Sequence, residues 1–489
     1  MKTQIVILGL AGAFLILNSP VLAIERLVPS QYSTIQAAID DCNNGDVVIV
    51  EPNIYTGPGN RDIDFKGLAI TVRSTDPNDP YVVAATVIDC EGSPSSKHRG
   101  FRFHSGEGPN SIVAGFTIIN GDAPEEQIGG LPRDVGGAVA CDGASPTIRH
   151  CIISNNYARR NGYGGGICCW NGSSAKMEYC TITNNYAHNS GGGILSYNSS
   201  PIIRNCIIKE NTTGSSDGGG MWCMSGGAVS IHHCVIEGNV AEAFGGGIGI
   251  ADISGGTIDN CIILDNSAGT FNFGGSGGGI FGRDSTATVS NCTIVGNSAN
   301  GWDPEIPIGY GGGLYSEDSS VLVRDCIFWD NTADNDGQQI YGGSISVAYS
   351  DVQDGYAGTG NIHDDPCFVT GPLGDYYLSQ IAAGQDSNSP CVDAGSDTAA
   401  NLGMDIFTTR TDEVLDAGIV DMGYHYSAPI AADINRDLKV DLKDLAILGS
   451  QWRQEPGIPS ADIAPPGGDG RVDEKDLAVL VDTCLWEKQ

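Results

Sequence analysis

Basic residues are scarce in this 489-residue chain. It has 25 Lys and Arg residues against 59 Asp and Glu residues, which gives a formal net charge of -34. Nucleic acids and anionic membrane surfaces are bound through clusters of positive charge. The composition therefore excludes both as partners, and an acidic glycan would need bridging calcium to approach such a surface.

Long apolar runs are also rare. Met1 and Lys2 lead into one such run, Ile5 to Leu17, which is followed by Val21-Leu22-Ala23. A basic start, a short apolar stretch and a small final residue are typical of a signal peptide, and the stretch is too short to span a bilayer comfortably. We predict a signal peptide over residues 1–23 and no integral membrane segment in the mature chain. The protein is then secreted or at the cell surface, and we expect a monomer.

Familiar catalytic signatures are missing as well, since the chain contains no Ser-His-Asp, zinc or P-loop motif. It contains a repeat instead. Seven times between residues 148 and 333 an apolar residue is followed by Cys three positions later, a large apolar residue two positions after that, and Asn three positions further on. A period of 26 to 34 residues indicates a stacked repeat. The repeat cysteines are Cys151, Cys180, Cys206, Cys234, Cys261, Cys292 and Cys326.

The same spacing would fit a leucine-rich repeat, but each unit lacks the helix formers that the convex side of such a repeat requires. Each unit also has a glycine cluster, such as Gly245-Gly246-Gly247, about 13 or 14 residues before its cysteine. Coils of short strands and turns remain. Strand alternation then places Ile148, Cys151 and Ile153 inward, with a bend at His150 and at the equivalent position of every coil.

The phrase Ile203-Arg204-Asn205-Cys206-Ile207-Ile208 resembles the strand, asparagine turn and strand of right-handed parallel β-helices of the pectate-lyase-like kind. The resemblance implies an all-β solenoid over residues 24–365. Ile35, Ala38 and Ile39, behind a serine cap, predict the short N-terminal helix that covers the first coil in such folds. Residues 366–428 resemble the segment that closes the other end of the solenoid.

The 16 cysteines of an exported chain suggest disulfides by compartment. One Cys per coil at an inward position instead predicts a stacked core of small thiols. Cys141, Cys169 and Cys223 are expected to form a second inward column. Better disulfide candidates are Cys42 with Cys90 and Cys367 with Cys391, although the sequence leaves the pairing open.

Residues 429–489 contain two calcium-loop patterns. Oxygen-bearing side chains at alternating loop positions before an apolar helix are how a hard cation is bound. The pattern Val440-Asp441-Leu442-Lys443-Asp444-Leu445 recurs as Val472-Asp473-Glu474-Lys475-Asp476-Leu477. This duplication resembles a type I dockerin, a small all-α calcium-binding module that docks onto cohesin-bearing scaffolds. Leu438 replaces the usual glycine of the first loop, and Pro465 and Gly467 replace two ligands of the second loop. The expected calcium ligands are Asp433, Asn435, Asp437, Lys439 (through its carbonyl), Asp441 and Asp444, then Asp469, Asp473 and Asp476.

Alternation after the glycine clusters sends a stripe of large side chains outward, beside insertions at 269–276 and 299–310. Aromatic faces with flanking carboxylates suit sugars, whose C–H faces pack on rings while their hydroxyls bind acids. The alternative is an outer face covered by its own loops. The candidate substrate-binding residues are Trp170, Tyr197, Trp222, Phe281, Trp302 and Tyr315, and the candidate catalytic residues are Arg283, Asp284, Glu317 and Asp318.

Two functions of different classes follow. The first is a carbohydrate-active β-helix protein, a polysaccharide lyase or glycoside hydrolase, with a dockerin-like tail. A lyase would use Arg283 as base with calcium on the uronate, and a hydrolase would use two carboxylates. The second is a non-catalytic surface adhesin or glycan-binding protein. The tail favours the first function, and the regular repeats without a catalytic signature favour the second.

Overall fold

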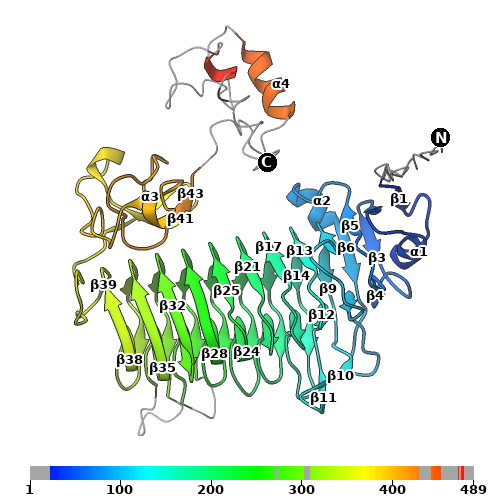
Figure 1. Ribbon diagram of the computed structural model, residues 1–489, viewed down its shortest axis with the longest axis horizontal. Coiled ribbons are helices and arrows are strands. Elements are labelled where there is room, and N and C mark those ends of the chain that lie inside the picture. Colours follow the sequence, from blue (N-terminus) through cyan, green and yellow to red (C-terminus); the bar gives the residue numbers. More distant parts are fainter. Residues whose placement is uncertain are drawn as a thin grey trace, which may run out of the picture.

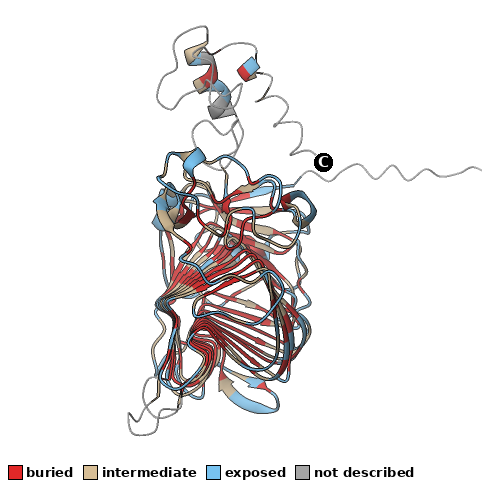
Figure 2. Ribbon diagram, turned by 90° about the vertical axis from the view of Figure 1, so that its left-hand side faces the viewer, coloured by how far each residue is buried: buried red, intermediate tan, exposed pale blue. Residues whose placement is uncertain are grey.

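The chain folds into a solenoid of stacked parallel coils, as a computed structural model shows. The structure describes residues 23–269, 274–301, 309–428, 442–452, 472, 475–477 and 479. In Figure 1 the coils follow one another from the blue N-terminal end to the yellow C-terminal end, and Figure 2 looks along the stack. The predicted all-β parallel solenoid is confirmed.

Two parallel sheets run along the whole solenoid and a third joins them from residue 157 onward, and each coil contributes strands to them in turn. The first sheet contains β1 (Glu25–Val28), β2 (Val47–Val50), β4 (Ile63–Asp64), β5 (Thr71–Ser74), β7 (Phe101–Phe103), β8 (Ile112–Ala114), β12 (Val139–Asp142), β13 (Thr147–Arg149), β16 (Ile167–Trp170), β17 (Lys176–Glu178), β20 (Ile194–Tyr197), β21 (Ile202–Arg204), β24 (Met221–Gly226), β25 (Ser230–His232), β28 (Ile248–Asp259), β31 (Ile280–Arg283), β32 (Thr286–Ser290), β35 (Leu314–Arg324) and β38 (Ile340–Ala348).

The second sheet contains β3 (Asn53–Tyr55), β6 (Thr86–Asp89), β9 (Thr117–Ile119), β14 (Ile152–Ser154), β18 (Thr181–Thr183), β22 (Ile207–Lys209), β26 (Val235–Glu237), β29 (Ile262–Leu264), β33 (Thr293–Val295), β36 (Ile327–Trp329) and β39 (Asp351–Val352). The third sheet contains β15 (Tyr157–Ala158), β19 (Tyr186–Ala187), β23 (Thr212–Thr213), β27 (Val240–Ala241), β30 (Ser267–Ala268), β34 (Ser298–Ala299) and β37 (Thr332–Ala333).

Several kinds of bend join these strands, and two of them are expected from the sequence. Between the first and second sheets His150, Asn205 and Asp325 have positive φ, at 51°, 52° and 55°. The bend expected at these positions is therefore confirmed, and it is made by residues that tolerate the left-handed region or bond their own backbone. Before the first sheet Gly245 has a φ of 66°, and a Cβ there would lie 2.8 Å from the carbonyl oxygen of Ile248. Glycine is required at that turn.

A column of buried asparagines holds successive coils together. The backbone N–H and the Nδ2 of Asn211 both donate to Oδ1 of Asn239, each at 3.0 Å, and Nδ2 also donates to the carbonyl of Ile182 at 2.9 Å. The same pattern repeats from coil to coil, and every member is buried. The column consists of Asn156, Asn185, Asn211, Asn239, Asn266, Asn297 and Asn331.

The core is filled by inward-facing rows, with one residue of each coil above the equivalent residue of the next. All seven repeat cysteines are buried in it, and so are Cys141, Cys169 and Cys223. Both predicted thiol columns are confirmed. The 15 described cysteines are unpaired, so the structure does not form the suggested Cys42–Cys90 and Cys367–Cys391 bridges.

The N-terminal end is covered by helix α1 (Ile35–Asp40), whose residues Ile35, Ala38 and Ile39 are buried against the first coils. This part of the prediction is confirmed. The cap residue differs from the expected serine: Thr34 has the extended backbone of an N-cap, and its hydroxyl accepts from the N–H of Ala37 at 3.2 Å. A second short helix, α2 (Pro80–Ala85), begins with Asp79 as its cap.

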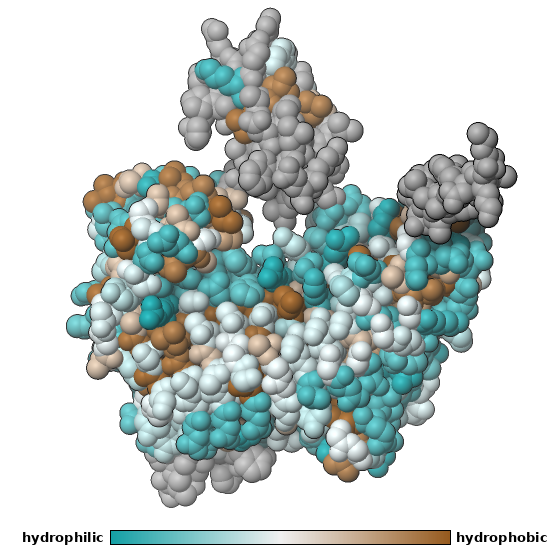
Figure 3. Space-filling model, viewed as in Figure 1, coloured by the Kyte–Doolittle hydropathy of each residue, from teal (hydrophilic) through white to brown (hydrophobic). Residues whose placement is uncertain are grey.

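Residues 366–428, the closing segment, lie along the flank of the solenoid rather than across its open end. The segment contains the hairpin of β40 (Phe368–Gly371) and β41 (Gly374–Leu378), the 3-10 turn η1 (Ile381–Ala383), helix α3 (Ala399–Leu402), and the pair β42 (Phe407–Thr408) and β43 (Tyr426–Ser427). Leu378, Cys391 and Met422 pack on Ile327, which points outward from the second sheet. The segment lies on this face because it buries apolar side chains that point outward from the second sheet and would otherwise contact water. Figure 3 shows hydrophobic atoms on its outer side, at the upper left.

The remaining elements are the hairpin of β10 (Glu125–Ile128) and β11 (Leu131–Asp134) and, in the tail, helix α4 (Leu442–Gln451). The first helical run predicted for the tail is therefore present. No described helix is long and apolar enough to cross a membrane. Residues 1–22 of the expected signal peptide lie outside the described part of the chain.

Because the core thiols are buried, the pKa values of Cys151, Cys180 and Cys206 are raised well above the usual range, mainly by desolvation. Thiolates are the reactive form, so these groups should be inert in the native protein. Only Cys42 and Cys367 among the described cysteines are not buried. Cys484 lies outside the described residues, so the test uses a Cys484→Ser chain, which keeps 15 of the 16 cysteines. We expect Ellman's reagent to modify two thiols in the native state and all 15 after denaturation. Fewer than 15 in denaturant would contradict the absence of disulfides.

Candidate functional site

The aromatic stripe expected on the first sheet is present, but most of it is buried. Trp170, Trp222 and Phe281 point away from the main core, yet each is at most 1% exposed. They form a second core with Ile128 of the β10–β11 hairpin and with Phe244, which precedes a glycine cluster. The prediction that these three rings are exposed sugar platforms is therefore wrong. Large rings gain free energy when the neighbouring loops fold over them, and the alternative of a self-covered face applies here.

Close packing between coils reinforces this second core. Gly249 is the residue of β28 aligned with Trp222 of β24, and a Cβ at Gly249 would lie 2.0 Å from the Trp222 ring. The absent side chain leaves room for the indole to extend over the next coil, where it stacks with Phe281 at 6.0 Å between ring centroids. Tyr197 is only half-buried, but its hydroxyl would lie 3.3 Å from a Cβ at Gly129 of the hairpin. Trp302 lies outside the described residues.

At its C-terminal end the stripe borders an open hollow. Phe281 stacks on Tyr315 at 5.6 Å, and Tyr315 stacks on Tyr341 at 6.0 Å with an interplanar angle of 8°. Tyr315 and Tyr341 are partly exposed and line a hollow together with Tyr356. Of the predicted platforms, Tyr315 is thus the one placed at an open site.

That hollow is one of three adjoining pockets, which we call the groove. They have volumes of about 680, 630 and 670 Å³ and lie on the outer side of β28, β32, β35 and β38, at the last four coils of the first sheet. Ser344 borders all three, and Ser320 and Thr286 border two of them. The pockets are therefore continuous over several coils, which is a shape suited to an extended ligand.

Carboxylates border the groove at the bend within three of these four coils. Asp252, Asp284 and Asp318 have φ values of 53°, 48° and 48°, in the left-handed region that aspartate tolerates. They occupy equivalent places on neighbouring parallel strands, which are spaced by about 4.8 Å. All three are exposed, and the structure gives none of them an ion pair with a described residue. They provide a row of hydrogen-bond acceptors.

The other two predicted catalytic residues, Arg283 and Glu317, are direct neighbours in the register of β31 and β35. The Arg283 guanidinium lies 5.9 Å from the centre of the Phe281 ring, and Arg283 makes no ion pair with any described residue. Glu317 borders the groove beside Tyr315 and Asp318. The structure therefore brings the four candidate catalytic residues into one area, with Arg283 at its margin.

Hydroxyl side chains complete the floor of the groove. Thr286, Ser320 and Ser344 form one row across three strands, and Thr288 and Ser346 belong to the next row. The sequence reasoning missed these rows because single serines and threonines give no distinctive signal. It also missed Tyr341, although a signal existed. Gly337-Gln338-Gln339 takes the place of a glycine cluster, and Tyr341 then occupies the position that Tyr315 occupies one coil earlier.

No group of three or more potential metal ligands occurs among the described side chains. Of the predicted calcium ligands, Asp433, Asn435, Asp437, Lys439, Asp441, Asp469 and Asp473 lie outside the described residues. Asp444 is part of helix α4, and Asp476 is buried in a short helical stretch. The calcium sites remain predictions.

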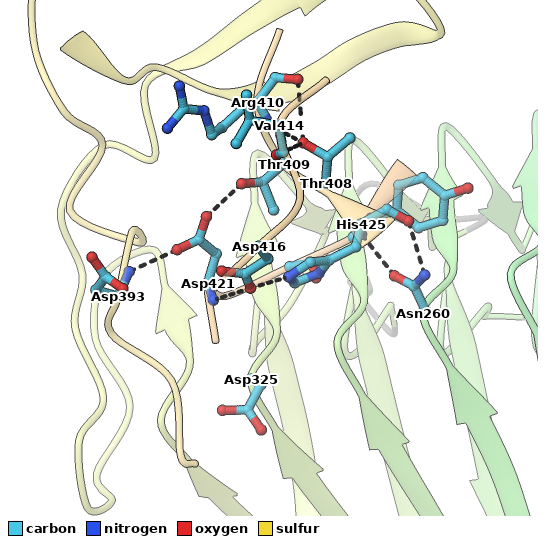
Figure 4. Close-up of polar contacts among 12 residues, drawn as sticks. Asn260, Asp325, Asp393, Thr408, Thr409, Arg410, Val414, Asp416, Asp421 and His425 are labelled. Carbon is cyan, nitrogen blue, oxygen red and sulfur yellow. Dashed lines mark hydrogen bonds and ion pairs between the residues drawn. The ribbon is translucent and has the colours of Figure 1, made fainter. Parts of the chain in front are cut away.

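A second group of polar residues lies between the closing segment and the solenoid (Figure 4). His425 Nε2 lies 2.9 Å from Asp416 Oδ2, and the His425 backbone N–H donates to Asn260 Oδ1 at 2.7 Å. Asp421 Oδ1 accepts from the N–H of Asp393 at 2.7 Å, and its other oxygen contacts the Thr409 hydroxyl. His425, Asp416 and Asp421 are all buried, so a ligand cannot reach them. This group anchors the closing segment.

Burial raises the pKa values of several carboxylates of this interface, among them Asp421 and Asp351. Desolvation raises the pKa of Asp421 to about 6, and the nearby Asp416 adds to the effect. Desolvation also raises the pKa of Asp351 to about 6, although the Cys391 thiol donates to its Oδ2 at 3.2 Å and partly offsets the shift. Both groups bind a proton more tightly in the folded state than in the unfolded state.

Comparison with known proteins agrees with this architecture. Residues 133–250 and 215–363 match the family described as "Right handed beta helix region", so the solenoid is a right-handed parallel β-helix. A solved structure titled "Crystal structure of pectate lyase Pel9A" is similar at 14% sequence identity, with coverage of 82% of this chain and 96% of that chain and a TM-score of 0.42. No curated protein matches the sequence significantly.

The raised pKa of Asp351 predicts a pH-dependent anchor. The Asp351 carboxyl has a pKa of about 6 in the folded state and about 3.9 in the unfolded state. The free energy of unfolding therefore falls by about 2 to 3 kcal/mol as the pH rises from about 4 to about 6. Asp351→Asn removes this titration. We expect the variant to slow hydrogen exchange in residues 389–423 relative to the unsubstituted chain at pH 7.5 but not at pH 4.

Comparing the two chains at each pH cancels the intrinsic pH dependence of exchange. Asp354→Asn, at an exposed position three residues further along the chain, is the matched control and should have no such effect. Equal differences between Asp351→Asn and the unsubstituted chain at both pH values would contradict the assignment.

Proposed function

We propose that the solenoid binds a polysaccharide chain in the groove. The observation that carries the proposal is the continuity of three pockets over four coils, with stacked tyrosines at one end. A polysaccharide is extended and repetitive, and so is this surface. Tyrosine rings offer faces for sugar C–H groups, and the serine, threonine and aspartate rows offer hydrogen-bond partners for hydroxyls.

The charge of the groove favours a neutral polysaccharide. Asp252, Asp284, Glu317 and Asp318 border it, and Arg283 stands only at its margin. A uronate chain would meet like charges along the row of aspartates, unless calcium bridged the two. Neutral sugar hydroxyls can instead donate to these carboxylates, and hydrogen bonds to charged acceptors are stronger than those to neutral ones.

Cleavage of the bound chain is a second candidate function, and the clustering of the four candidate catalytic residues favours it. Glycoside hydrolysis needs two carboxyl groups across the bond, one as acid and the other as base or nucleophile. Asp284 and Asp318 occupy neighbouring coils with Glu317 beside them. A lyase would use Arg283 as the base, and in that case calcium would have to neutralise the uronate.

We further propose that the protein is exported through its N-terminal signal and attached through its tail. The duplicated loop pattern of residues 429–489 supports a dockerin-like module that binds calcium and a cohesin-type scaffold. In such a module the loop side chains supply the oxygens that surround calcium, and the ion fixes the start of each following helix. Helix α4 begins within the first predicted loop, as this arrangement requires.

Tyr341→Ala should weaken polysaccharide binding without unfolding the coils, because Tyr341 belongs to the last strand of the first sheet. We expect roughly a tenfold loss of affinity, about 1.4 kcal/mol, from removal of one ring face. Affinity electrophoresis in gels containing neutral or acidic polysaccharides measures it. Tyr81→Ala, at an 85% exposed tyrosine of helix α2, is the control and should bind normally.

The same preparations decide between binding and cleavage. Reducing-end and unsaturated-uronate assays, with and without calcium, should detect products if the candidate catalytic residues act, and Glu317→Gln should then abolish them. Retained binding without products on any glycan identifies a binding protein. Equal affinity of the Tyr341→Ala and unsubstituted chains for every bound glycan would refute the groove as the binding site.

Calcium removal tests the tail separately. A ligand that binds only the folded state stabilises it in proportion to the logarithm of its concentration over its dissociation constant. We expect EDTA to lower the melting temperature of the tail transition in calorimetry and to leave the solenoid transition unchanged. Asp437→Ala should reproduce this effect in the presence of calcium. An unchanged tail transition after chelation would refute the calcium site.

A further inference from the structure

A separate cavity lies on the other flank of the solenoid, between the second sheet and the closing segment. Its volume is about 500 Å³, within the range of small-molecule sites. Leu264 and Glu237 come from the solenoid, whereas Tyr376, Tyr424 and Leu373 come from the closing segment. We propose that this cavity, the corner pocket, is a second carbohydrate-binding site that takes a unit of a neutral glycan.

The aromatic wall of the corner pocket is fixed before any ligand arrives. Tyr426 stacks on the buried Tyr377 with centroids 3.9 Å apart, and Tyr424 meets Tyr426 edge-on at 4.8 Å. The N–H of Tyr376 donates to the Tyr426 hydroxyl at 3.0 Å, and the Tyr376 ring packs edge-on against Phe368 at 5.2 Å. A preformed wall lowers the entropic cost of binding a flat sugar face.

Polar groups surround this wall at several separate positions. Glu237 is half-buried, while Asp265 and Asp375 are exposed at the rim. Burial raises the pKa of Tyr376, and Asp265, Asp375 and Glu237 add to the shift, so its hydroxyl stays protonated and can donate. The corner pocket thus offers one aromatic hydroxyl and several carboxylate oxygens to the hydroxyl groups of a sugar.

The charge distribution selects the ligand class. Anionic sugars are disfavoured because no positively charged residue of the described chain lines the pocket. The nearest cation in the register of the second sheet is Lys209, which neighbours Glu237 but lies outside the pocket lining. A cationic ligand is less favoured than a neutral one, since Asp265 and Asp375 are hydrated at the rim and need no counter-charge. Several spaced acceptors beside ring faces match a polyhydroxylated ligand better than a point charge.

Two sites on different flanks would make the protein bivalent for glycan. The groove lies on the first sheet and the corner pocket on the second, and both belong to the C-terminal half of the solenoid. Simultaneous binding of two chain segments raises avidity without any new contact. The inference takes its ligand class from the proposed function, but its residues are independent of the groove.

The test uses affinity electrophoresis of the full chain in gels containing galactomannan, xyloglucan, mixed-linkage β-glucan or xylan, with polygalacturonate as the acidic comparison. Two substitutions are made in the Tyr341→Ala background, so that only the corner pocket is probed. Tyr376→Ala removes one ring of the aromatic wall in the closing segment, and Glu237→Gln replaces a half-buried carboxylate on β26 of the solenoid by an amide of similar size. Tyr81→Ala in the same background is the control. Melting temperatures verify folding.

We expect at least one neutral glycan to retard the Tyr341→Ala chain. Adding either Tyr376→Ala or Glu237→Gln should lower the affinity for that glycan by about fivefold or more. Adding Tyr81→Ala should leave the affinity unchanged. If Tyr341→Ala alone has no effect and the pocket substitutions abolish binding, the corner pocket stands and the groove fails. Residual binding that neither pocket substitution changes, binding of polygalacturonate alone, competition by N-acetyl-lysine amide, or no neutral-glycan binding at all would overturn the inference.

Discussion

Hydrogen bonding between coils is the constraint on which the rest of the structure depends. Each coil is too thin to satisfy its own backbone, so its N–H and C=O groups pair with the coils above and below, in register along three sheets. At the turn after the second sheet, where strand pairing is interrupted, the asparagine column continues the ladder. Asn239 alone donates to Ile208 and Asn266 and accepts from Asn211. Loss of such a side chain would leave several buried polar groups unpaired, at about 1 to 3 kcal/mol each.

Register has a direct consequence for function. Because equivalent residues stack at each coil, any outward position becomes a row along the solenoid axis. The inward row of the seven repeat cysteines is uniform, and it serves as part of the core. The outward rows change character gradually. One row begins at buried Trp222, continues through Gly249 and Phe281, and ends at partly exposed Tyr315 and Tyr341, which border the groove. Trp170 belongs to the neighbouring row, together with Tyr197.

Much of the repeat could be read from the sequence, because it depends on local rules. Alternation placed Cys151 inward, and the bend at His150 follows from the turn preferences of its equivalents. The burial of the aromatic stripe could not be predicted from such local rules. Whether Trp222 faces solvent depends on Gly249 one coil later and on Phe244, which folds over the stripe, and strand periodicity contains neither fact.

The flank position of the closing segment likewise depends on Ile327 and Asn260, which are remote from it in sequence. Tyr341 could have been found by treating Gln338 and Gln339 as a degenerate glycine cluster.

Both candidate sites occur where the periodic structure is interrupted, and there is a physical reason for this. A regular coil buries its apolar rows and pairs its backbone, so little remains for a ligand to satisfy. The groove lies on the last four coils of the first sheet, where exposed aspartates at the bends have no ion pair with a described residue. The corner pocket lies where the closing segment stops covering the second sheet, so that Leu264 and Glu237 meet a wall of tyrosines from a distant part of the chain. The repeat provides a rigid frame, and its ends and additions provide the surfaces that can recognise another molecule.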